Sequence, residues 1–369
     1  MRRAFLSFIT VISLCLTTIP SHGLEPLENY LRSSTLADPS ALIVDTSDEK
    51  AYLEYSPDSI RTPASLLKLI STTAALHYVG TERRYTTSIW STNKDGVFVF
   101  KGGMDPWLTS DSLRAARNKQ RYLPFLVAKA NTKNSKSITI YYSSMYKKDM
   151  TDLTTFLRKK KKIRLTSIPI STSDAEMKAK EQIATMTSEP ITTMVSHAIL
   201  WSVNELADRL GKEAVKKVGN PLTPQGITAT FASALSDLGV DSTGLYAEDG
   251  SGLSKANRTT SRTLVALLAK IRNEPTYQSI YDGLPIAGLT GTLLKRFSTS
   301  PYAIGHVHAK TGLLRTVASL AGYIDIGNKE YAFAIIADEI KPGNAAQLAA
   351  RKTLDEMLGA FVRANLASG

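Results

Sequence analysis

The sequence predicts a protein of the α/β (α+β) class, in which a mixed sheet is flanked by helices and carries an inserted β-rich domain. Three observations lead to this prediction. Two short strand patterns lie near the start of the chain, three lie near its end, and helical patterns surround them. Short alternating stretches interrupt the helical part. The 369 residues, 43% of them hydrophobic, suffice for a large core and an insertion.

The N-terminal elements are expected to be a β-hairpin and a helix. Residues 41–44 and 51–55 form strand patterns, and a turn-rich segment lies between them. A helix is expected to begin at Ser65 and to end at Gly80. Pro63 stands just before its apolar run, which is a common signal for a helix N-terminus.

The middle of the chain has a different texture. Strand patterns at 85–90, 97–100 and 137–142 are separated by polar, Lys-rich connections. We therefore place an inserted β-rich domain at 81–184, between two parts of one larger domain, 24–80 and 185–369. Helices are expected over 191–210 and 258–272, strands over 305–310, 318–324 and 331–337, and a last helix over 344–366.

Residues 1–23 have the pattern of a signal peptide. Arg2 and Arg3 precede an uncharged apolar stretch, and small residues before Leu24 favour cleavage after Gly23. The alternative is an uncleaved membrane anchor, but the apolar stretch ends at Pro20 and is short for a span of roughly 20 residues. We expect an exported protein, periplasmic or extracellular and associated with the cell wall. Cys15 is the only cysteine, so the mature chain would form no disulfide.

The charge balance is strongly basic. The formal net charge is +12, and loss of Arg2 and Arg3 with no acidic residue leaves +10. An exported protein seldom meets nucleic acid, so we expect no nucleic-acid partner. An anionic wall polymer or a membrane surface is the more sensible partner, through the basic run Arg158–Arg164. The alternative for this run is an ordinary solvated helix end or loop.

Ser65 and Lys68 form a Ser-x-x-Lys motif on the expected first helix. Residues three apart on a helix share a face, so Lys68 can remove the proton that makes the Ser65 hydroxyl a poor nucleophile. Apolar neighbours would bury Lys68 and lower its pKa toward the working pH. The Ser65 N–H can form half of an oxyanion hole. The same spacing also occurs at Ser47, Ser91 and Ser144, but only Ser65 opens an apolar helix behind a proline.

Two further motifs follow along the chain. In Ser202-Val203-Asn204, the hydroxyl can relay a proton and the amide can hold a substrate amide, provided that the motif lies in a loop between helices. The alternative is a polar patch on an amphipathic helix. Lys310-Thr311-Gly312 lies at the end of a strand pattern, where a cation and a hydroxyl suit a substrate carboxylate. The Leu313 N–H would be the second oxyanion donor, and the alternative is a hairpin turn.

No metal or cofactor is expected. His306 and His308 would share one side of a strand, but no third ligand is evident. The segment 249–254 could suggest a phosphate or metal loop, yet it lacks the acidic spacing of such sites, and we interpret it as an ordinary turn.

Several longer segments accompany the three motifs in order. They are Gly102-Gly103-Met104-Asp105-Pro106-Trp107-Leu108, Asp249-Gly250-Ser251-Gly252-Leu253-Ser254 with Asn257-Arg258, Leu284-Pro285-Ile286-Ala287-Gly288 with Gly291-Thr292-Leu293, and Ala309 to Leu313 with Ser319-Leu320-Ala321-Gly322-Tyr323. Together they resemble the D-alanyl-D-alanine carboxypeptidases/endopeptidases of the low-molecular-mass class C penicillin-binding proteins, peptidase family S13. The resemblance covers most of residues 40–340.

The resemblance implies a penicillin-binding-protein/β-lactamase-like transpeptidase fold, with 24–80 and 185–369 as the catalytic domain. It also implies roles for the motif residues. Ser65 would be the acylated nucleophile, Lys68 the base, Ser202 the proton relay and Asn204 the substrate-amide anchor, with Lys310 and Thr311 as a carboxylate clamp beside Gly312 and Leu313. The substrates would be peptidoglycan stem peptides, and β-lactam antibiotics would acylate the same serine as inhibitors.

The chain also departs from long family members. Only 137 residues separate Ser65 from Ser202, so the insertion at 81–184 is trimmed, which leaves side-chain selectivity and endopeptidase activity open. Two alternatives remain. One is a serine β-lactamase, although no Glu-x-x-x-Asn segment follows Ser202 in a loop. The other is a non-catalytic secreted wall-binding protein of the same fold.

Overall fold

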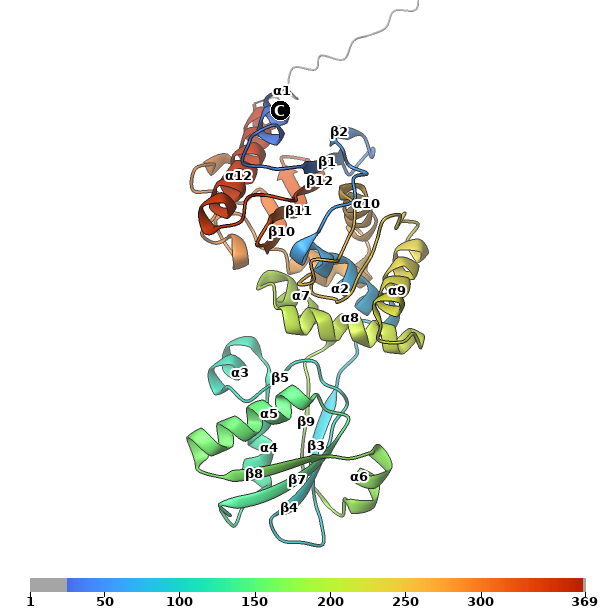
Figure 1. Cartoon of the computed structure of the whole chain (residues 1–369), viewed down its shortest axis with the longest axis vertical. Helices are drawn as coiled ribbons and strands as arrows, with labels where there is room; N and C mark the ends of the chain where they lie inside the picture. The colour runs from blue at the N-terminus through green and yellow to red at the C-terminus, as the bar shows by residue number, and fades with distance from the viewer. Residues whose placement is uncertain (1–24, 368–369) are drawn as a thin grey trace, which may run out of the picture.

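The computed structural model describes residues 25–367, and the signal peptide expected at 1–23 lies outside the described residues. The expected fold class is confirmed, because helices flank sheets throughout the described chain. Figure 1 shows two lobes, with the insertion below and the N- and C-terminal parts of the chain together above.

The upper lobe is built on one five-stranded sheet in the order β10-β11-β12-β1-β2. Its strand pairs are antiparallel, so the N-terminal hairpin adds directly to the C-terminal meander. The strands are β1 (Pro39–Asp45), β2 (Ala51–Tyr55), β10 (Val307–Leu314), β11 (Val317–Ile326) and β12 (Lys329–Ala337).

Helices cover both faces of this sheet, which explains why its central strands are almost wholly apolar. Along β12, Phe333 and Ile335 join the core on one face, whereas Ala334 and Ile336 join the core on the other. One face packs against α1 (Glu25–Leu31) and α12 (Asn344–Leu366). The opposite face packs against α2 (Leu67–Val79), α7 (Ile191–Leu200), α8 (Asn204–Val218), α9 (Pro224–Asp237), α10 (Ser261–Ile271) and α11 (Gln278–Asp282).

The insertion forms a second five-stranded sheet in the order β8-β7-β4-β3-β9, with both parallel and antiparallel pairs. The strands are β3 (Thr86–Ser91), β4 (Val97–Lys101), β7 (Ser137–Ser143), β8 (Arg164–Pro169) and β9 (Gln182–Thr187). A small ladder joins β5 (Leu108–Thr109) to β6 (Arg121–Tyr122). A separate hydrophobic core, which includes Phe100 and Ile140, packs against the five-stranded sheet of the insertion.

Helices lie between the strands of the insertion, although the sequence pattern there indicated mainly strands. They are α3 (Ser112–Asn118), α4 (Leu123–Ala130), α5 (Lys147–Phe156) and α6 (Thr172–Lys178). The parallel pairs β4–β7 and β7–β8 require such crossovers, because parallel neighbours cannot be joined by a tight hairpin. A short π-helical turn, η2 (Leu157–Lys161), continues α5 into the basic run.

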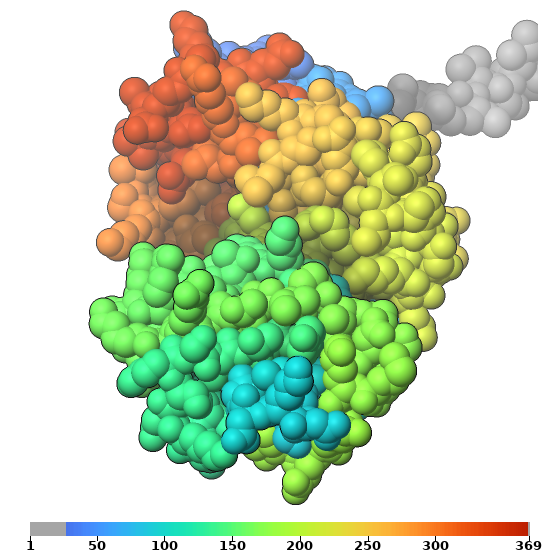
Figure 2. Space-filling model, turned by 60° about the horizontal axis from the view of Figure 1, so that its bottom comes forward, coloured from blue at the N-terminus to red at the C-terminus, as the bar shows by residue number. Residues whose placement is uncertain are grey.

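The chain enters and leaves the insertion at one place. Tyr85 and Ser188 exchange backbone and side-chain hydrogen bonds, and the Ile191 N–H donates to the Arg83 carbonyl at 2.9 Å. Figure 2 shows the insertion as a lobe of its own, with a hollow between it and the orange C-terminal segments. Within residues 25–367, no helix has the length and apolarity that a membrane span needs.

Candidate active site

Ser65 lies in a short turn that opens the central helix of the upper lobe. The turn is the 3-10 helix η1 (Ala64–Leu66), and α2 continues from it. Ala64 adopts a left-handed conformation with φ 51°, which turns the chain after Pro63 so that Ser65 begins the helical segment. Lys68 follows on the first turn of α2, and its side chain is fully buried.

The amine of Lys68 has three oxygen neighbours. Its Nζ lies 2.8 Å from Ser65 Oγ, 2.7 Å from Asn204 Oδ1 and 2.5 Å from the Ser251 carbonyl. Burial lowers the pKa of Lys68 to about 7, although the carboxylates of Asp249 and Asp208 act in the opposite direction. A substantial fraction of this amine is therefore uncharged near neutral pH.

The second motif lies in the turn between α7 and α8. The sequence pattern continued as one helix over 191–210, but the structure ends α7 at Leu200 and begins α8 at Asn204. Ser202 adopts a left-handed conformation with φ 54°. Such a residue is strained by about 1–3 kcal/mol, and here it allows Ser202 and Asn204 to reach the two lysines of the site.

Lys310 lies on β10, opposite Ala321 of β11, and is fully buried. Its Nζ donates to Ser202 Oγ at 2.9 Å and to the Thr311 carbonyl at 2.7 Å. Burial lowers the pKa of Lys310 well below its usual value, and the positive charge of Lys68 acts in the same direction. The two amines thus belong to one electrostatic site.

Gly312 brings strand β10 against the turn that carries Ser65. A Cβ atom at this position would lie 2.1 Å from Ser319 Oγ and 2.9 Å from the Pro63 carbonyl, so only glycine fits. Ser319 Oγ donates to the same Pro63 carbonyl at 3.0 Å. The strand edge and the Ser65 turn are therefore in direct contact.

The remaining residues of the third motif are less enclosed. Thr311 Oγ1 lies 3.0 Å from Thr292 Oγ1, which comes from the turn η4 (Gly291–Leu293). The side chain of Leu313 is 42% exposed, so it lies at the surface beside the site. Its backbone N–H, and not its side chain, is the group that the sequence singled out.

The segment 249–254, which the residues alone indicated to be an ordinary turn and which also carried part of the family resemblance, contacts Lys68 through the Ser251 carbonyl. The Asp249 carboxylate accepts hydrogen bonds from the N–H groups of Ser251, Gly252 and Ser254. Burial raises the pKa of Asp249, but these bonds outweigh it and the net shift is downward. The loop therefore closes around a carboxylate and presents the Ser251 carbonyl to Lys68. The Asp-Gly-Ser-Gly sequence was the available signal.

Gly252 holds this loop against the Ser65 turn. Its φ is 82°, and a Cβ atom there would lie 1.8 Å from the Ala64 carbonyl oxygen. The loop is also tied to the helices behind it, because Gly250 N donates to Asp208 at 3.0 Å and Ser71 Oγ donates to the Gly250 carbonyl at 2.7 Å.

The two histidines lie apart from these groups, and only His308 belongs to β10, because the strand begins at Val307. His306 Nδ1 is 2.7 Å from the Asp325 carbonyl, and His308 stacks on Tyr281. Across the described part of the chain, no group of three His, Cys, Asp or Glu side chains could hold a metal ion.

The arrangement combines four chemical functions in one place. A serine hydroxyl faces an amine of near-neutral pKa, and a second hydroxyl faces a second amine. An amide, Asn204, lies beside the first amine, and a strand edge borders the serine. This set suits nucleophilic acyl transfer with proton transfer on both sides of the reacting carbonyl.

Comparison with known proteins gives a family match. The model of the D-Ala-D-Ala carboxypeptidase 3 (S13) family matches residues 24–122 and 146–361. Among curated relatives, a carboxypeptidase of Mycobacterium tuberculosis is 34% identical over 44% of this chain and 36% of its own length. A D-alanyl-D-alanine carboxypeptidase of Actinomadura sp. (strain R39) is 34% identical over 47% of this chain and 32% of its own length. The aligned part thus spans about a third of these relatives.

Solved structures share the fold over nearly the whole chain. Penicillin binding protein 4 of Haemophilus influenzae matches with a TM-score of 0.69 at 17% identity, covering 90% of this chain and 99% of that one. A predatory peptidoglycan endopeptidase of Bdellovibrio bacteriovorus matches with a TM-score of 0.65 at 15% identity, covering 88% and 92%. An extended-spectrum β-lactamase matches more weakly, with a TM-score of 0.53.

Proposed function

Because this chain belongs to the D-Ala-D-Ala carboxypeptidase 3 (S13) family, we propose that it is a serine-type D-Ala-D-Ala carboxypeptidase acting on peptidoglycan stem peptides. The observation that carries the proposal is the pairing of Ser65 Oγ with Lys68 Nζ at 2.8 Å, in a site that lowers the pKa of the lysine to about 7. Penicillins would acylate the same serine and act as inhibitors.

In the acylation step, the neutral Lys68 amine would accept the Ser65 proton. A neutral amine keeps two N–H groups, which can donate to Asn204 Oδ1 and to the Ser251 carbonyl. Its lone pair then faces the Ser65 hydroxyl. Ser65 Oγ bonds to the carbonyl carbon of the penultimate D-Ala. The Ser65 and Leu313 N–H groups would stabilise the oxyanion.

Departure of the leaving group would use the second hydroxyl–amine pair. As the C–N bond of the substrate breaks, Ser202 would pass a proton to the nitrogen of the terminal D-Ala and regain one from Lys310. Lys310 and Thr311 would also hold the substrate carboxylate, whose negative charge favours the protonated form of the lysine. Before deacylation, Lys68 would release the proton taken from Ser65 and Lys310 would regain one, by exchange with solvent. The neutral Lys68 amine would then deprotonate a water molecule, whose oxygen bonds to the acyl carbon as the ester bond breaks, and Lys68 would return that proton to Ser65 Oγ.

Intact-mass spectrometry of the mature chain with benzylpenicillin tests this proposal, with Ser65→Ala as the control. We expect an adduct of one drug molecule on the parent and none on the variant, together with D-Ala release from a D-Ala-D-Ala peptide. Fast hydrolysis of the drug would favour a β-lactamase. A folded parent with neither adduct nor hydrolysis would favour a wall-binding protein.

Endopeptidase activity is a second candidate. The same acyl-enzyme chemistry would cleave a cross-link in which the leaving amine belongs to another stem peptide. Its support is the fold shared with the Bdellovibrio endopeptidase, a likeness that concerns the fold and not the activity. Incubation with a cross-linked stem-peptide dimer tests it, since monomer release by the parent and not by Ser65→Ala would establish the activity.

Location and wall contact complete the proposal. The signal peptide would direct export and then be cleaved after Gly23, so the chain recovered outside the cytoplasm should begin at Leu24, as N-terminal sequencing can show. The exposed cations of Arg158–Arg164 would contact anionic wall polymer. Retention on purified cell wall should then fall as salt is raised, because exposed charges are screened.

A further inference from the structure

A groove crosses the insertion and ends at the α7–α8 turn. Its outer part, about 300 Å³, lies between α3 on one side and the end of α5 with η2 on the other. Its inner part, about 90 Å³, reaches Val203 and Glu205 at the start of α8. The two parts adjoin, because Thr109, Ser110, Arg114 and Asp152 line both. The outer volume alone is at the lower end of known ligand pockets.

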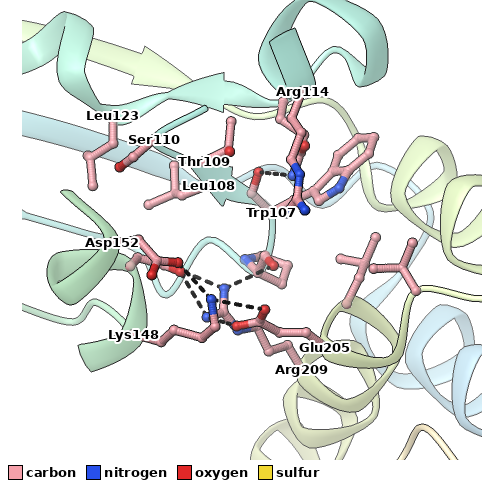
Figure 3. Close-up of a pocket in the computed structure, with 15 residues that line it drawn as sticks. Trp107, Leu108, Thr109, Ser110, Arg114, Leu123, Lys148, Asp152, Glu205 and Arg209 are labelled. Atoms are coloured by element: carbon pink, nitrogen blue, oxygen red, sulfur yellow. Dashed lines mark hydrogen bonds and ion pairs between the residues drawn. The ribbon is translucent and has the colours of Figure 1, made fainter. Parts of the chain in front are cut away.

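The inner end of the groove adjoins the candidate active site. Val203 stands between Ser202, which contacts Lys310, and Asn204, which contacts Lys68. Figure 3 shows Arg114 on the wall opposite Lys148, Glu205 and Arg209. The groove therefore ends beside the turn that carries Ser202 and Asn204.

Most of the groove charges that have no ion-pair partner within residues 25–367 are positive. Arg114 on one wall and Lys159 and Lys160 on the other form no ion pair with any carboxylate of the described chain. By contrast, Lys148 is paired with Asp152 at 2.6 Å, and the buried Arg209 is paired with Asp149 at 2.8 Å.

A polar group without a hydrogen-bond partner in the described chain lies where the two parts of the groove meet. The hydroxyl oxygen of Ser110 is buried and has no hydrogen-bond partner within residues 25–367. A buried polar atom without a partner is costly, and a ligand oxygen would satisfy it. Asp111 also lines the outer part; its Oδ1 accepts from the N–H groups of Leu113 and Arg114, and its negative charge has no ion-pair partner within residues 25–367.

We propose that this groove binds a distal part of the substrate, namely an extended peptide that bears free carboxylates and is joined to the acyl donor. This inference rests on the proposed function. Arginine and lysine side chains are suited to carboxylates, and the Ser110 hydroxyl can donate at the junction. Of the basic run, Lys159 and Lys160 would thus orient the substrate and not merely hold the protein to a surface.

Two stem-peptide donors of equal length test the proposal, one with free carboxylates along its distal part and one with those groups amidated. The test variant is Arg114→Glu/Lys159→Glu/Lys160→Glu. The matched control is Lys129→Glu/Lys136→Glu/Lys180→Glu, which makes the same charge change at exposed cations that do not line the groove.

For the test variant, we expect kcat/KM on the free-carboxylate donor to fall by about tenfold, as the loss of three exposed charge contacts would give. The amidated donor and the rate of acylation by benzylpenicillin should be unchanged. Ser110→Ala should lower kcat/KM on both donors relative to a short tripeptide. An equal loss for the control variant, or no preference of the parent for free carboxylates, would overturn the proposal.

A binding measurement separates this proposal from the proposed function. If the parent releases no D-Ala from any donor, the proposed function fails. Affinity of Ser65→Ala protein for the labelled free-carboxylate peptide, measured with and without the groove substitutions, still decides the groove. Binding of polyphosphate without binding of the peptide would assign the groove to a phosphate-rich polymer and overturn the proposal.

Discussion

Among single residues, Lys68 should control the pH dependence of acylation. Its neutral form is the base, and burial brings its pKa to about 7 from an ordinary value of 10.5. The rate of acylation by benzylpenicillin should therefore rise with pH between 6 and 8 and level off above. Stopped-flow kinetics measures this, and a rate that is flat across this range would contradict the assignment.

Replacement of the base gives a second readout at the same residue. Lys68→Met keeps an unbranched side chain in the buried position, so the fold should persist while acylation falls by roughly 10²–10⁴-fold. The pH dependence should vanish along with the rate. A folded Lys68→Met protein that acylates like the parent would exclude Lys68 as the base.

Gly252 offers a test of how closely the loop and the Ser65 turn are packed. Gly252→Ala should destabilise the protein by about 3 kcal/mol, because the new Cβ meets the Ala64 carbonyl and φ is positive. Acylation should slow as well. Gly327→Ala is the matched control, since φ is 61° there but no atom lies within 4 Å, and about 1 kcal/mol is expected. Chemical denaturation that gives equal losses would refute the packing argument.

At the level of elements, helix α8 joins the two lobes through a buried ion pair. Arg209 contacts Asp149 of α5, and burial raises the pKa of Asp149 to about 6 despite the attraction of Arg209. Burial thus outweighs the attraction for this carboxylate. Removing one partner leaves a buried charge uncompensated, whereas removing both does not.

Arg209→Leu should accordingly lower the free energy of unfolding by about 3 kcal/mol, and Arg209→Leu/Asp149→Leu should recover most of the loss. Lys212→Ala, which breaks a partly exposed pair on the same helix, should cost about 0.5 kcal/mol or less. Denaturant titration of the parent and these three variants tests the prediction. A double variant as unstable as Arg209→Leu would show that the pair stabilises the joint.

The sequence predicted the periodic elements best. The apolar runs of the last two strands and the pattern of residues 344–366 are local signals, so β11, β12 and α12 appear close to where they were expected. Strand β10 was expected over 305–310 but runs from Val307 to Leu314, so Lys310-Thr311-Gly312 lies within the strand and not at its end. The prediction of one helix over 191–210 was wrong near its middle. Hydrophobic periodicity does not reveal the left-handed backbone conformation of Ser202, which separates two helices there. The helices of the insertion were missed, since their polar faces resemble connections.

Tertiary contacts of the site could be predicted only in part. The three motifs predicted which side chains lie together in the site. In the structure, Lys68 contacts Ser65 and Asn204. Lys310 contacts Ser202. The Ser251 carbonyl contact with Lys68 could not be foreseen, because a backbone carbonyl has no residue signature. The same holds for Arg209 and Asp149, which lie 60 residues apart.

For the whole molecule, the insertion at 81–184 is proposed to be an independent domain. It has its own sheet and core, and its two ends meet at Tyr85 and Ser188. A fragment of residues 83–191 should therefore fold alone and melt in a single cooperative transition by circular dichroism. A fragment without such a transition would mean that contacts with α8 are needed to hold it together.

The position of β1 between β2 and β12 has a consequence for biogenesis. Its register with β12 pairs Pro39 with Ala337, so the N-terminal hairpin exposes an unsatisfied edge until nearly the entire chain has been delivered. A truncated or stalled polypeptide would keep that edge open and invite self-association. Antibiotic reactivity should thus appear only late during translocation, when the last strands arrive.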